Sequence, residues 1–226
     1  MAARDRRGGA APGTGRERPV RRSGSSARWL AEHFADPYVR RAQAEGARSR
    51  ARFKLEEIDR RERLVRSGLL VLELGAAPGA WSQYVRERLG RTGRLIAVDL
   101  LPMDPIPGVQ ILQADLREQT AWQAIETALA GERADLLLSD MAPNLSGMDV
   151  IDAPRTLNLA EMALEVADGA LKPGAAALIK VLQGAGFDEL LRLARQRFER
   201  VRCLKPAASR ARSPETYLLA SGRRMV

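Results

Sequence analysis

Short apolar runs and longer amphipathic stretches alternate along the chain after Gly68. The short runs predict buried strands at Leu69–Leu74, Leu95–Val98, Val109–Leu112, Asp135–Ser139, Ala176–Leu182, Arg200–Leu204 and Thr216–Ala220. The amphipathic stretches predict helices at Ser82–Leu89, Ala121–Leu129, Pro154–Leu171 and Phe187–Arg197. Strands that alternate with helices indicate an α/β fold, built as a doubly wound and mostly parallel sheet.

The N-terminal part of the chain has a different pattern. Residues 1–28 are largely Arg, Gly, Ala and Ser, with almost no large apolar side chain, which predicts a disordered, solvated tail. Residues 29–66 predict short helical pieces followed by a helix at Ala47–Glu62. We therefore expect a basic tail and one domain, 29–226, in which this helical region precedes a core of strands and helices, 67–226.

The first predicted strand ends in a loop of small residues that resembles a ligand site. The loop, Gly75-Ala-Ala-Pro-Gly79, lies where a parallel strand gives way to a helix, as in many nucleotide-type sites. A dinucleotide fingerprint requires Gly-x-Gly-x-x-Gly, with amides that bind a pyrophosphate. The Gly-x-x-x-Gly spacing and Pro78 favour a ligand with adenosine and an amino-acid tail, S-adenosylmethionine (SAM). A tight turn without a ligand is the alternative.

Three acidic residues follow successive predicted strands. Asp99 closes the second strand, where an acid usually accepts hydrogen bonds from the ribose hydroxyls of an adenosine. Asp115 follows the third strand and could accept the adenine amino group, and Asp140 follows the fourth. A single acid at such a place is more often a helix cap. Three acids at one edge of a parallel sheet indicate a shared crevice.

Lysine is rare in this arginine-rich chain. Of 37 basic residues, four are lysine: Lys54, Lys172, Lys180 and Lys205. Lysine can lose its proton when desolvated or placed near another cation, whereas arginine cannot. Lys180 interrupts the apolar run Ala177–Leu182, where a charge is costly without a partner; an exposed strand end is the alternative. Lys172 fits a structural helix-exit turn, and Lys54 and Glu215 are weak signals alone.

Composition and charge restrict the classes of partner and site. The net charge of +9 and the pI near 10.6 indicate a polyanionic partner, although charge alone does not separate nucleic acid from an acidic membrane. No apolar run approaches a membrane span. One histidine and one cysteine, Cys203, make a zinc site and an intrachain disulfide untenable. A lone cysteine suits a reducing compartment, so we expect a cytoplasmic protein.

Six motifs, taken together and in order, resemble the FtsJ/RrmJ (RlmE) family of ribosomal RNA large-subunit 2′-O-methyltransferases. The resemblance runs from about Ser25 to the C-terminus, and Ala80, Glu73 and Pro214 are small departures from the family pattern. The motifs are Leu74–Gly79, Trp81–Val85, Asp99–Pro105, Ser139–Asn144, Lys180–Gly184 and Ser209–Ser213.

The resemblance implies a fold and a set of site residues. It implies a Rossmann-like SAM-dependent methyltransferase fold, with a seven-stranded, mostly parallel sheet, helices on both faces and an antiparallel last strand. It implies a catalytic tetrad of Lys54, Asp140, Lys180 and Glu215. It also implies that SAM binds at the loop and the strand-end acids, through Gly75, Gly79, Trp81, Asp99, Asp115 and Asp140.

The resemblance further implies the reaction and the substrate, a uridine in the A-loop of 23S ribosomal RNA on the 50S subunit. Our hypothesis is that Lys180 accepts the proton of the ribose 2′-hydroxyl, while Asp140 orients it and Glu215 positions Lys54 or the ribose. An electrostatic clamp at Lys180, with water as the proton acceptor, is the alternative. We expect a monomer that binds RNA phosphates through its tail, Arg40–Arg63 and the Arg210/Arg212 loop.

Three other functions stay open on the sequence alone. A 2′-O-methyltransferase acting on tRNA or mRNA caps would share the tetrad. A non-catalytic ribosome-assembly factor would share the basic charge but have no use for the tetrad. An NAD-dependent dehydrogenase is disfavoured because the third glycine of its fingerprint is missing.

Overall fold

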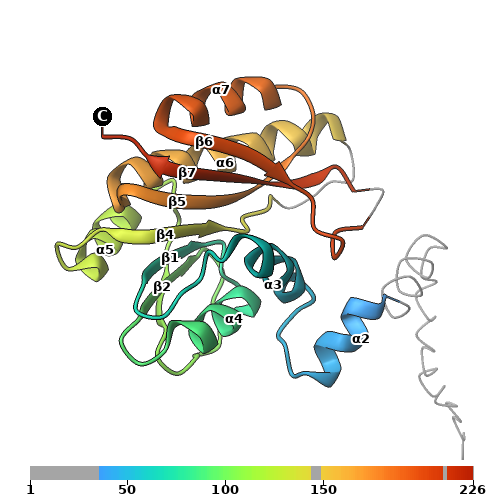
Figure 1. The fold of residues 1–226 in the computed structure, drawn as a ribbon, viewed down its shortest axis with the longest axis vertical. Coiled ribbons are helices and arrows are strands. Elements are labelled where there is room, and N and C mark those ends of the chain that lie inside the picture. The colour runs from blue at the N-terminus through green and yellow to red at the C-terminus, as the bar shows by residue number, and fades with distance from the viewer. Residues whose placement is uncertain (1–35, 144–148, 211–212, 226) are drawn as a thin grey trace, which may run out of the picture. The chain divides into compact units, whose positions relative to one another are not determined.

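The computed structural model describes residues 36–143, 149–210 and 213–225, with the backbone alone at 149–153. The chain divides into two compact units, Met1–Asp36 and Pro37–Val226. Only the second is described below (Figure 1). The predicted tail at residues 1–28 lies outside the described part of the chain.

The second unit consists of strands and helices in alternation. The helices are α2 Pro37–Ala44, α3 Ala51–Glu62, α4 Ala80–Leu89, α5 Gln119–Leu129, α6 Asp149–Ala170 and α7 Phe187–Arg197. The strands are β1 Leu70–Leu74, β2 Arg94–Asp99, β3 Gln110–Gln113, β4 Ala134–Ser139, β5 Leu171–Leu182, β6 Phe198–Leu204 and β7 Glu215–Arg223. Among the described residues, no helix combines the length and the apolar character that a bilayer crossing requires.

The strands form one seven-stranded sheet in the order β3-β2-β1-β4-β5-β7-β6. The strands from β3 across to β5 are parallel, whereas β7 runs antiparallel to both β5 and β6. The order reverses at β1, so the chain leaves the carboxyl ends of β1 and β4 on one edge, where α/β proteins bind their ligands. The expected α/β, Rossmann-like fold with an antiparallel last strand is confirmed.

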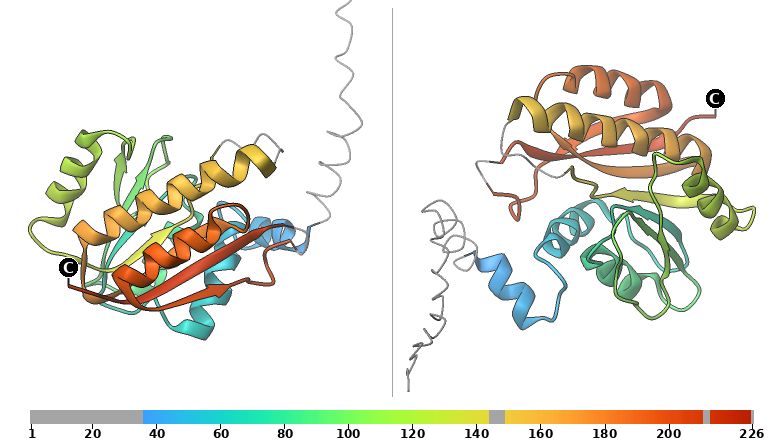
Figure 2. Two further views of the ribbon diagram at one scale, coloured as in Figure 1. Left: turned by 90° about the horizontal axis from the view of Figure 1, so that it is seen from above. Right: turned by 180° about the vertical axis from the view of Figure 1, so that it is seen from behind.

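Alternate residues of each strand pack on opposite faces of the sheet, as the two-residue period of a strand requires. On one face, Leu72 and Ile179 pack with residues of α5, α6 and α7. On the other face, Val71 and Leu178 pack with residues of α3 and α4. Figures 1 and 2 show these two helical layers on either side of the sheet. The second layer brings α3 over the carboxyl ends of the central strands.

Most predicted boundaries shift by up to three residues, and three shift by four or five. The helix expected from Ala47 begins at Ala51, and the helix expected from Pro154 begins at Asp149, with the proline inside it. Strand β5 begins at Leu171 rather than Ala176, so Lys172 lies on a strand and not in a helix-exit turn. The sequence pattern misses this start because Pro173 and Gly174 are exposed and interrupt the apolar run, and a proline has no amide to donate to a neighbouring strand. Leu171 nevertheless pairs with Ala134, next to a register shift.

Candidate active site

The loop after β1 crosses from the end of β1 to the start of α4. The amides of Gly75 and Ala76 both donate to the carbonyl of Val98, at 2.9 and 3.2 Å, which ties the loop to β2. A cis peptide bond joins Ala77 and Pro78, and both glycines have a positive φ, 74° at Gly75 and 102° at Gly79. The loop is therefore held by its own backbone against the neighbouring strand.

The two loop glycines also sit too close to protein atoms to carry a side chain. A Cβ on Gly75 would lie 2.6 Å from the amide nitrogen of Met141, and one on Gly79 would lie 2.7 Å from Nη1 of Arg48. The sequence predicts that these glycines belong to a SAM site. The structure gives a reason for them within the fold itself, close packing against Met141 and Arg48, and their contact with a ligand stays a prediction.

Asp99 and Asp115 lie at the ends of β2 and β3, at the same edge of the sheet. Asp99 accepts hydrogen bonds from the amides of Ala77 and Leu101, both at 2.8 Å, so it links the loop after β1 to the loop after β2. Asp115 binds the side chain of Arg117, with Nε 2.9 Å from Oδ1. The side-chain hydrogen bonds from Arg117 lower the pKa of Asp115 to about 2. Each carboxylate thus has partners within the fold, and its remaining lone pairs can accept further hydrogen bonds.

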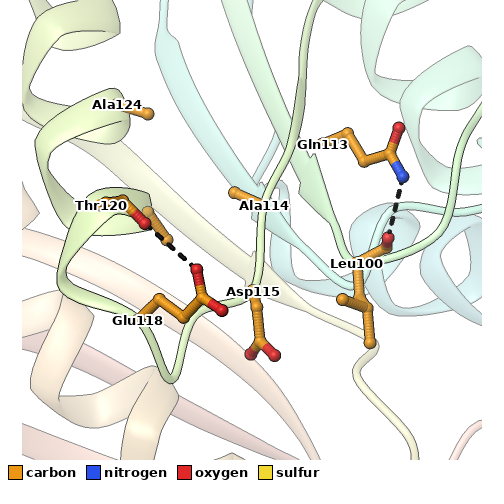
Figure 3. A pocket seen from close by; sticks show the side chains of 8 residues that line it. Leu100, Gln113, Ala114, Asp115, Glu118, Thr120 and Ala124 are labelled. Carbon is orange, nitrogen blue, oxygen red and sulfur yellow. Dashed lines mark hydrogen bonds between the residues drawn. The ribbon is translucent and has the colours of Figure 1, made fainter.

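A hollow of about 420 Å³ opens between the ends of β2, β3 and α5 (Figure 3). Figure 3 shows Leu100 and Gln113 on one side of it, Glu118, Thr120 and Ala124 on the other, and Ala114 and Asp115 between them. The side-chain amide of Gln113 donates to the carbonyl of Leu100 at 3.2 Å, which ties the end of β3 to the loop after β2. The wall thus combines an apolar side chain with a carboxylate, a pairing that suits a base with an exocyclic amino group.

Trp81 lies in the core and not in the crevice. Its side chain is buried, its indole Nε1 donates to the carbonyl of Ala51 at 2.8 Å, and its ring packs on Tyr217 with the centroids 5.7 Å apart. The side chain thereby joins α4 to α3. A contact between Trp81 and a cofactor would have to come from its backbone.

The four residues of the expected tetrad form two ion pairs. Lys180 Nζ lies 3.1 Å from Asp140 Oδ1, and Lys54 Nζ lies 2.7 Å from Glu215 Oε1. The four side chains are only 10–17% exposed. Lys180 is therefore not at an exposed strand end. Each amine therefore has its own carboxylate within ion-pair distance.

Tyr217 connects these two ion pairs, and sequence reasoning missed it. It pairs with Lys180 across the β5–β7 ladder, and its hydroxyl donates to Asp140 Oδ1 at 3.0 Å. Burial raises the pKa of Tyr217 well above its usual value, and the carboxylates of Asp140 and Glu215 add to this effect. The strand period could have found it, because Tyr217 lies two residues after Glu215 and so shares its face of β7.

Ser209 supports the second ion pair and was noted before only as part of a motif. Its hydroxyl donates to Glu215 Oε1 at 2.8 Å. Burial alone would raise the pKa of Glu215, but the charge of Lys54, the hydrogen bonds from Lys54 and Ser209 and the charge of Lys180 outweigh it, so the pKa lies below its usual value. Glu215 is therefore a stable counterion for Lys54.

Glu73 is a buried acid beside the loop, on β1. Its Oε2 accepts a hydrogen bond from the Ser82 hydroxyl at 2.6 Å, and its Oε1 has no partner among the described residues. Burial raises the pKa of Glu73 to about 8, and the charges of Asp140 and Asp99 act in the same direction against the hydrogen bond from Ser82. The sequence showed Glu73 only as a departure from a family pattern.

A family model described as FtsJ-like methyltransferase matches residues 47–223, which is most of the chain. The chain belongs to the FtsJ-like methyltransferase family. A ribosomal RNA large subunit methyltransferase E of Xanthomonas euvesicatoria pv. vesicatoria (strain 85-10) is 56% identical to this FtsJ-like methyltransferase over 204 residues, which cover 90% of this chain and 97% of the relative. The protein of the same name from Xanthomonas oryzae pv. oryzae (strain PXO99A) is 55% identical over 204 residues, which again cover 90% of this chain and 97% of the relative.

Solved structures share the fold of this FtsJ-like methyltransferase. A Plasmodium falciparum protein described as a ribosomal RNA methyltransferase superposes with a TM-score of 0.71 at 24% identity, and covers 78% of this chain and 98% of its own. A Methanococcus jannaschii fibrillarin, described as a pre-rRNA processing protein, superposes with a TM-score of 0.50 at 13% identity over 72% of this chain and 70% of its own. At these identities the likeness concerns the fold.

Three arginines of the FtsJ-like methyltransferase between Arg40 and Arg63 form ion pairs with its own carboxylates. Arg41 and Arg60 both pair with Glu56, and Arg52 pairs with Glu87 on α4. RNA phosphates would compete with these carboxylates, and the RNA contact predicted for this stretch stays a prediction. The tail and Arg212, which were also predicted to bind RNA, lie outside the described residues.

Proposed function

We propose that this methyltransferase uses SAM to methylate a ribose 2′-hydroxyl of ribosomal RNA, at a uridine of the 23S A-loop in the 50S subunit. The observation that carries the proposal is the pair of lysine–carboxylate ion pairs joined by Tyr217, at the ligand-binding edge of the sheet. A methyl transfer to an alcohol needs a group that takes the proton of the alcohol. A largely buried lysine in a polar cluster is suited to this task.

The residues of the crevice fit SAM. The carboxylates of Asp99 and Asp115 offer acceptors for ribose hydroxyls and for an adenine amino group. Asp115 lines the hollow together with Leu100, and Asp99 immediately precedes Leu100. The loop from Gly75 to Gly79, whose amides at Gly75 and Ala76 tie it to β2, would hold the methionine moiety. Bound there, SAM would supply an electrophilic methyl group on a positively charged sulfur.

Lys180 is the proton acceptor in this proposal, and it takes that proton as the neutral amine, the form that burial and a nearby cation favour in a lysine. Its side chain is 10% exposed, and its Nζ lies between the backbone carbonyl of Asp140, at 2.5 Å, and the Asp140 carboxylate. Asp140 is itself held from the other side by the Tyr217 hydroxyl. This arrangement fixes the direction of the amine, so that a ribose hydroxyl in the crevice would meet it in one geometry. General-base assistance of this kind contributes roughly 10²–10⁴-fold to a rate.

Lys54 and Glu215 have a different role from that of Lys180 in this proposal, because they are paired with each other. The Lys54 ammonium is a donor held by a carboxylate that Ser209 also supports, so it can position the ribose or an adjacent phosphate. Glu215 acts through Lys54 and not on the reacting atoms. Removal of the lysine should therefore cost more activity than removal of the glutamate.

Ribosomal RNA as the substrate rests on the relatives and on charge. The relatives with 55–56% identity are named ribosomal RNA large subunit methyltransferase E, and the chain covers 97% of their length. The net charge of +9 suits a polyanion. We also place the protein in the cytoplasm, as a monomer, where it would meet 50S particles.

The test is transfer of labelled methyl from SAM to 50S subunits purified from cells that lack this enzyme, with bulk tRNA as the competing substrate. We expect label in 23S RNA at one uridine, as an alkali-resistant 2′-O-methyl product. Label in tRNA, or on a base, would contradict the proposal. A folded protein that binds no SAM in calorimetry would instead indicate a non-catalytic assembly factor.

A further inference from the structure

Arg48 connects the loop after β1 and the loop after β2, the two loops that the proposed function assigns to SAM. It lies in the segment between α2 and α3, far in sequence from both loops. Its Nη1 donates to the carbonyls of Pro78 at 2.9 Å and Asp104 at 2.8 Å, and its Nη2 donates to the carbonyl of Pro105 at 2.9 Å. Pro78 belongs to the loop after β1, and the other two carbonyls belong to the loop after β2.

Arg48 is also fixed at its backbone and packed against the glycine of the first loop. Its amide donates to Gln83 Oε1 on α4 at 2.9 Å. The guanidinium occupies the space that a side chain on Gly79 would need, together with Met103 and Ile106 of the second loop. The guanidinium therefore bridges the two loops beside Gly79.

We infer that Arg48 is a positioning residue for SAM binding, which sets the spacing between the loop of Gly79 and the loop that begins at Asp99. This inference rests on the proposed function, because it takes SAM as the ligand. A planar guanidinium offers five donors in a fixed fork and can serve three carbonyls of two loops at once. A lysine ammonium at the same place would be a single point of attachment. Without the fork, the crevice loses its defined width.

The alternative role for Arg48 is an RNA contact, since it stands in the basic sequence Arg48-Ser-Arg-Ala-Arg52. The structure argues against it, because Nη1 and Nη2 are already committed to backbone carbonyls. An arginine that binds phosphate would have to release those carbonyls. The two roles differ in the substrate that a substitution affects.

The experiment compares full-length wild type, Arg48→Ala, Arg48→Lys and the control Arg192→Ala, which removes a charge from an exposed ion pair on α7. SAM affinity is measured by calorimetry without RNA. We expect both Arg48 variants to bind SAM about tenfold more weakly or worse, as for loss of charge-assisted hydrogen bonds. The kcat at saturating SAM and the KM for RNA should stay within about twofold of wild type, which a general loss of structure would not allow.

A second measurement keeps the inference independent of the ligand. Hydrogen exchange of the free protein should show faster exchange at residues 75–79 and 100–108 in the Arg48 variants, with α7 unchanged. Wild-type SAM affinity in Arg48→Ala or Arg48→Lys, or an effect confined to the KM for RNA, would overturn the inference while the proposed function stands. Wild-type protein that binds no SAM would overturn both.

Discussion

Tyr217 interacts with a carboxylate of each of the two ion pairs of the site. Its hydroxyl donates to Asp140, which holds Lys180, and it lies two residues beyond Glu215, which holds Lys54. The ring is fully buried against Trp81, so the hydroxyl has one position. The hydroxyl has one proton, which it donates to Asp140 Oδ1, and this fixes the direction of that hydrogen bond.

Tyr217→Phe keeps the ring and removes that donor. We expect kcat to fall roughly tenfold, because a lost hydrogen bond to a charged group is worth roughly 1.5–3 kcal/mol and frees Asp140 to turn away from Lys180. SAM affinity should stay near wild type. Single-turnover methyl transfer and SAM calorimetry measure the two effects. A variant with wild-type kcat would show that Asp140 needs no support from Tyr217.

Glu73 gives the fold a dependence on pH. Its pKa of about 8 lies above the ordinary value of 4.5, so the folded state holds the protonated form. The stability from this group is complete below about pH 4.5 and is lost as the pH rises through about 8. Glu73→Gln imitates the protonated form. Between about pH 4.5 and pH 8, the free energy of unfolding of Glu73→Gln should rise relative to that of wild type by up to about 1.4 kcal/mol per pH unit.

Denaturant unfolding of wild type and Glu73→Gln at several pH values measures this difference in stability. The control is Glu189→Gln, which alters an exposed carboxylate on α7 and should leave the pH curve parallel to that of wild type. A parallel curve for Glu73→Gln as well would show that Glu73 is ionised in the folded protein.

The residues of the site divide into those that sequence could reveal and those that it could not. Asp99, Asp115 and Asp140 stand at the ends of predicted strands. Lys180 is a rare lysine in an apolar run. The local sequence pattern was therefore enough to identify these four residues as candidates. Tyr217, Ser209 and Arg48 act through contacts across the sheet or between loops, which depend on register and loop paths. Trp81 lies in the right motif, but its indole packs in the core.

At the scale of elements, α3 is the one that brings Lys54 to the sheet. Leu55 and Ile58 pack on the face formed by Val71 and Leu178. Asp59, which is buried, accepts hydrogen bonds from the amide of Val65 at 2.8 Å and the hydroxyl of Tyr84 at 2.9 Å. The helix is thus held by apolar packing along its length and by one polar cluster at its end.

Asp59→Ala should destabilise the fold by about 2–6 kcal/mol, because it leaves a buried amide and a buried hydroxyl without their acceptor, at about 1–3 kcal/mol each. Glu87→Ala, which removes a half-exposed carboxylate from the adjacent helix α4, is the matched control and should cost about 1 kcal/mol or less. Chemical denaturation measures both. Equal losses in the two variants would mean that the Asp59 cluster does not hold α3.

The elements themselves were largely predictable. The predicted strands and the four helices after Gly68 all exist, because each carries an apolar pattern of one period. Boundaries failed where tertiary contacts decide, as at Leu171, which joins β5 only through its pairing with Ala134. Periodicity does not fix which strands are neighbours, so the antiparallel last strand was expected from the family resemblance alone.

At the scale of the whole molecule, charge governs the encounter with RNA. The net charge is +9, and residues 1–28 hold eight arginines against Asp5 and Glu17. Arg41, Arg60 and Arg52, which lie on or near α3, are instead paired with Glu56 or Glu87. The tail is therefore expected to supply much of the non-specific affinity, and the folded part to supply the geometry of the reaction.

RNA affinity should fall about 10³–10⁵-fold between 50 and 200 mM salt if 6–10 phosphates are contacted on a duplex, and less on single strands. A chain without residues 1–28 should show a shallower dependence and the same kcat at saturating RNA. Filter binding across a salt series, followed by methyl transfer, measures both quantities. Affinity that does not change with salt would exclude a phosphate-dominated interface.

The proposed chemistry depends above all on the amine of Lys180, which takes the proton of the ribose hydroxyl. Lys180→Arg keeps the positive charge and removes the acceptor, and Lys172→Arg is a control at a lysine paired with Asp135, outside the site. Single-turnover methyl transfer to 50S particles at saturating SAM is the decisive measurement. We predict a loss of roughly 10²–10⁴-fold for Lys180→Arg and near-normal turnover for Lys172→Arg. Near-normal turnover in Lys180→Arg would contradict the base role and leave Lys180 as an electrostatic clamp.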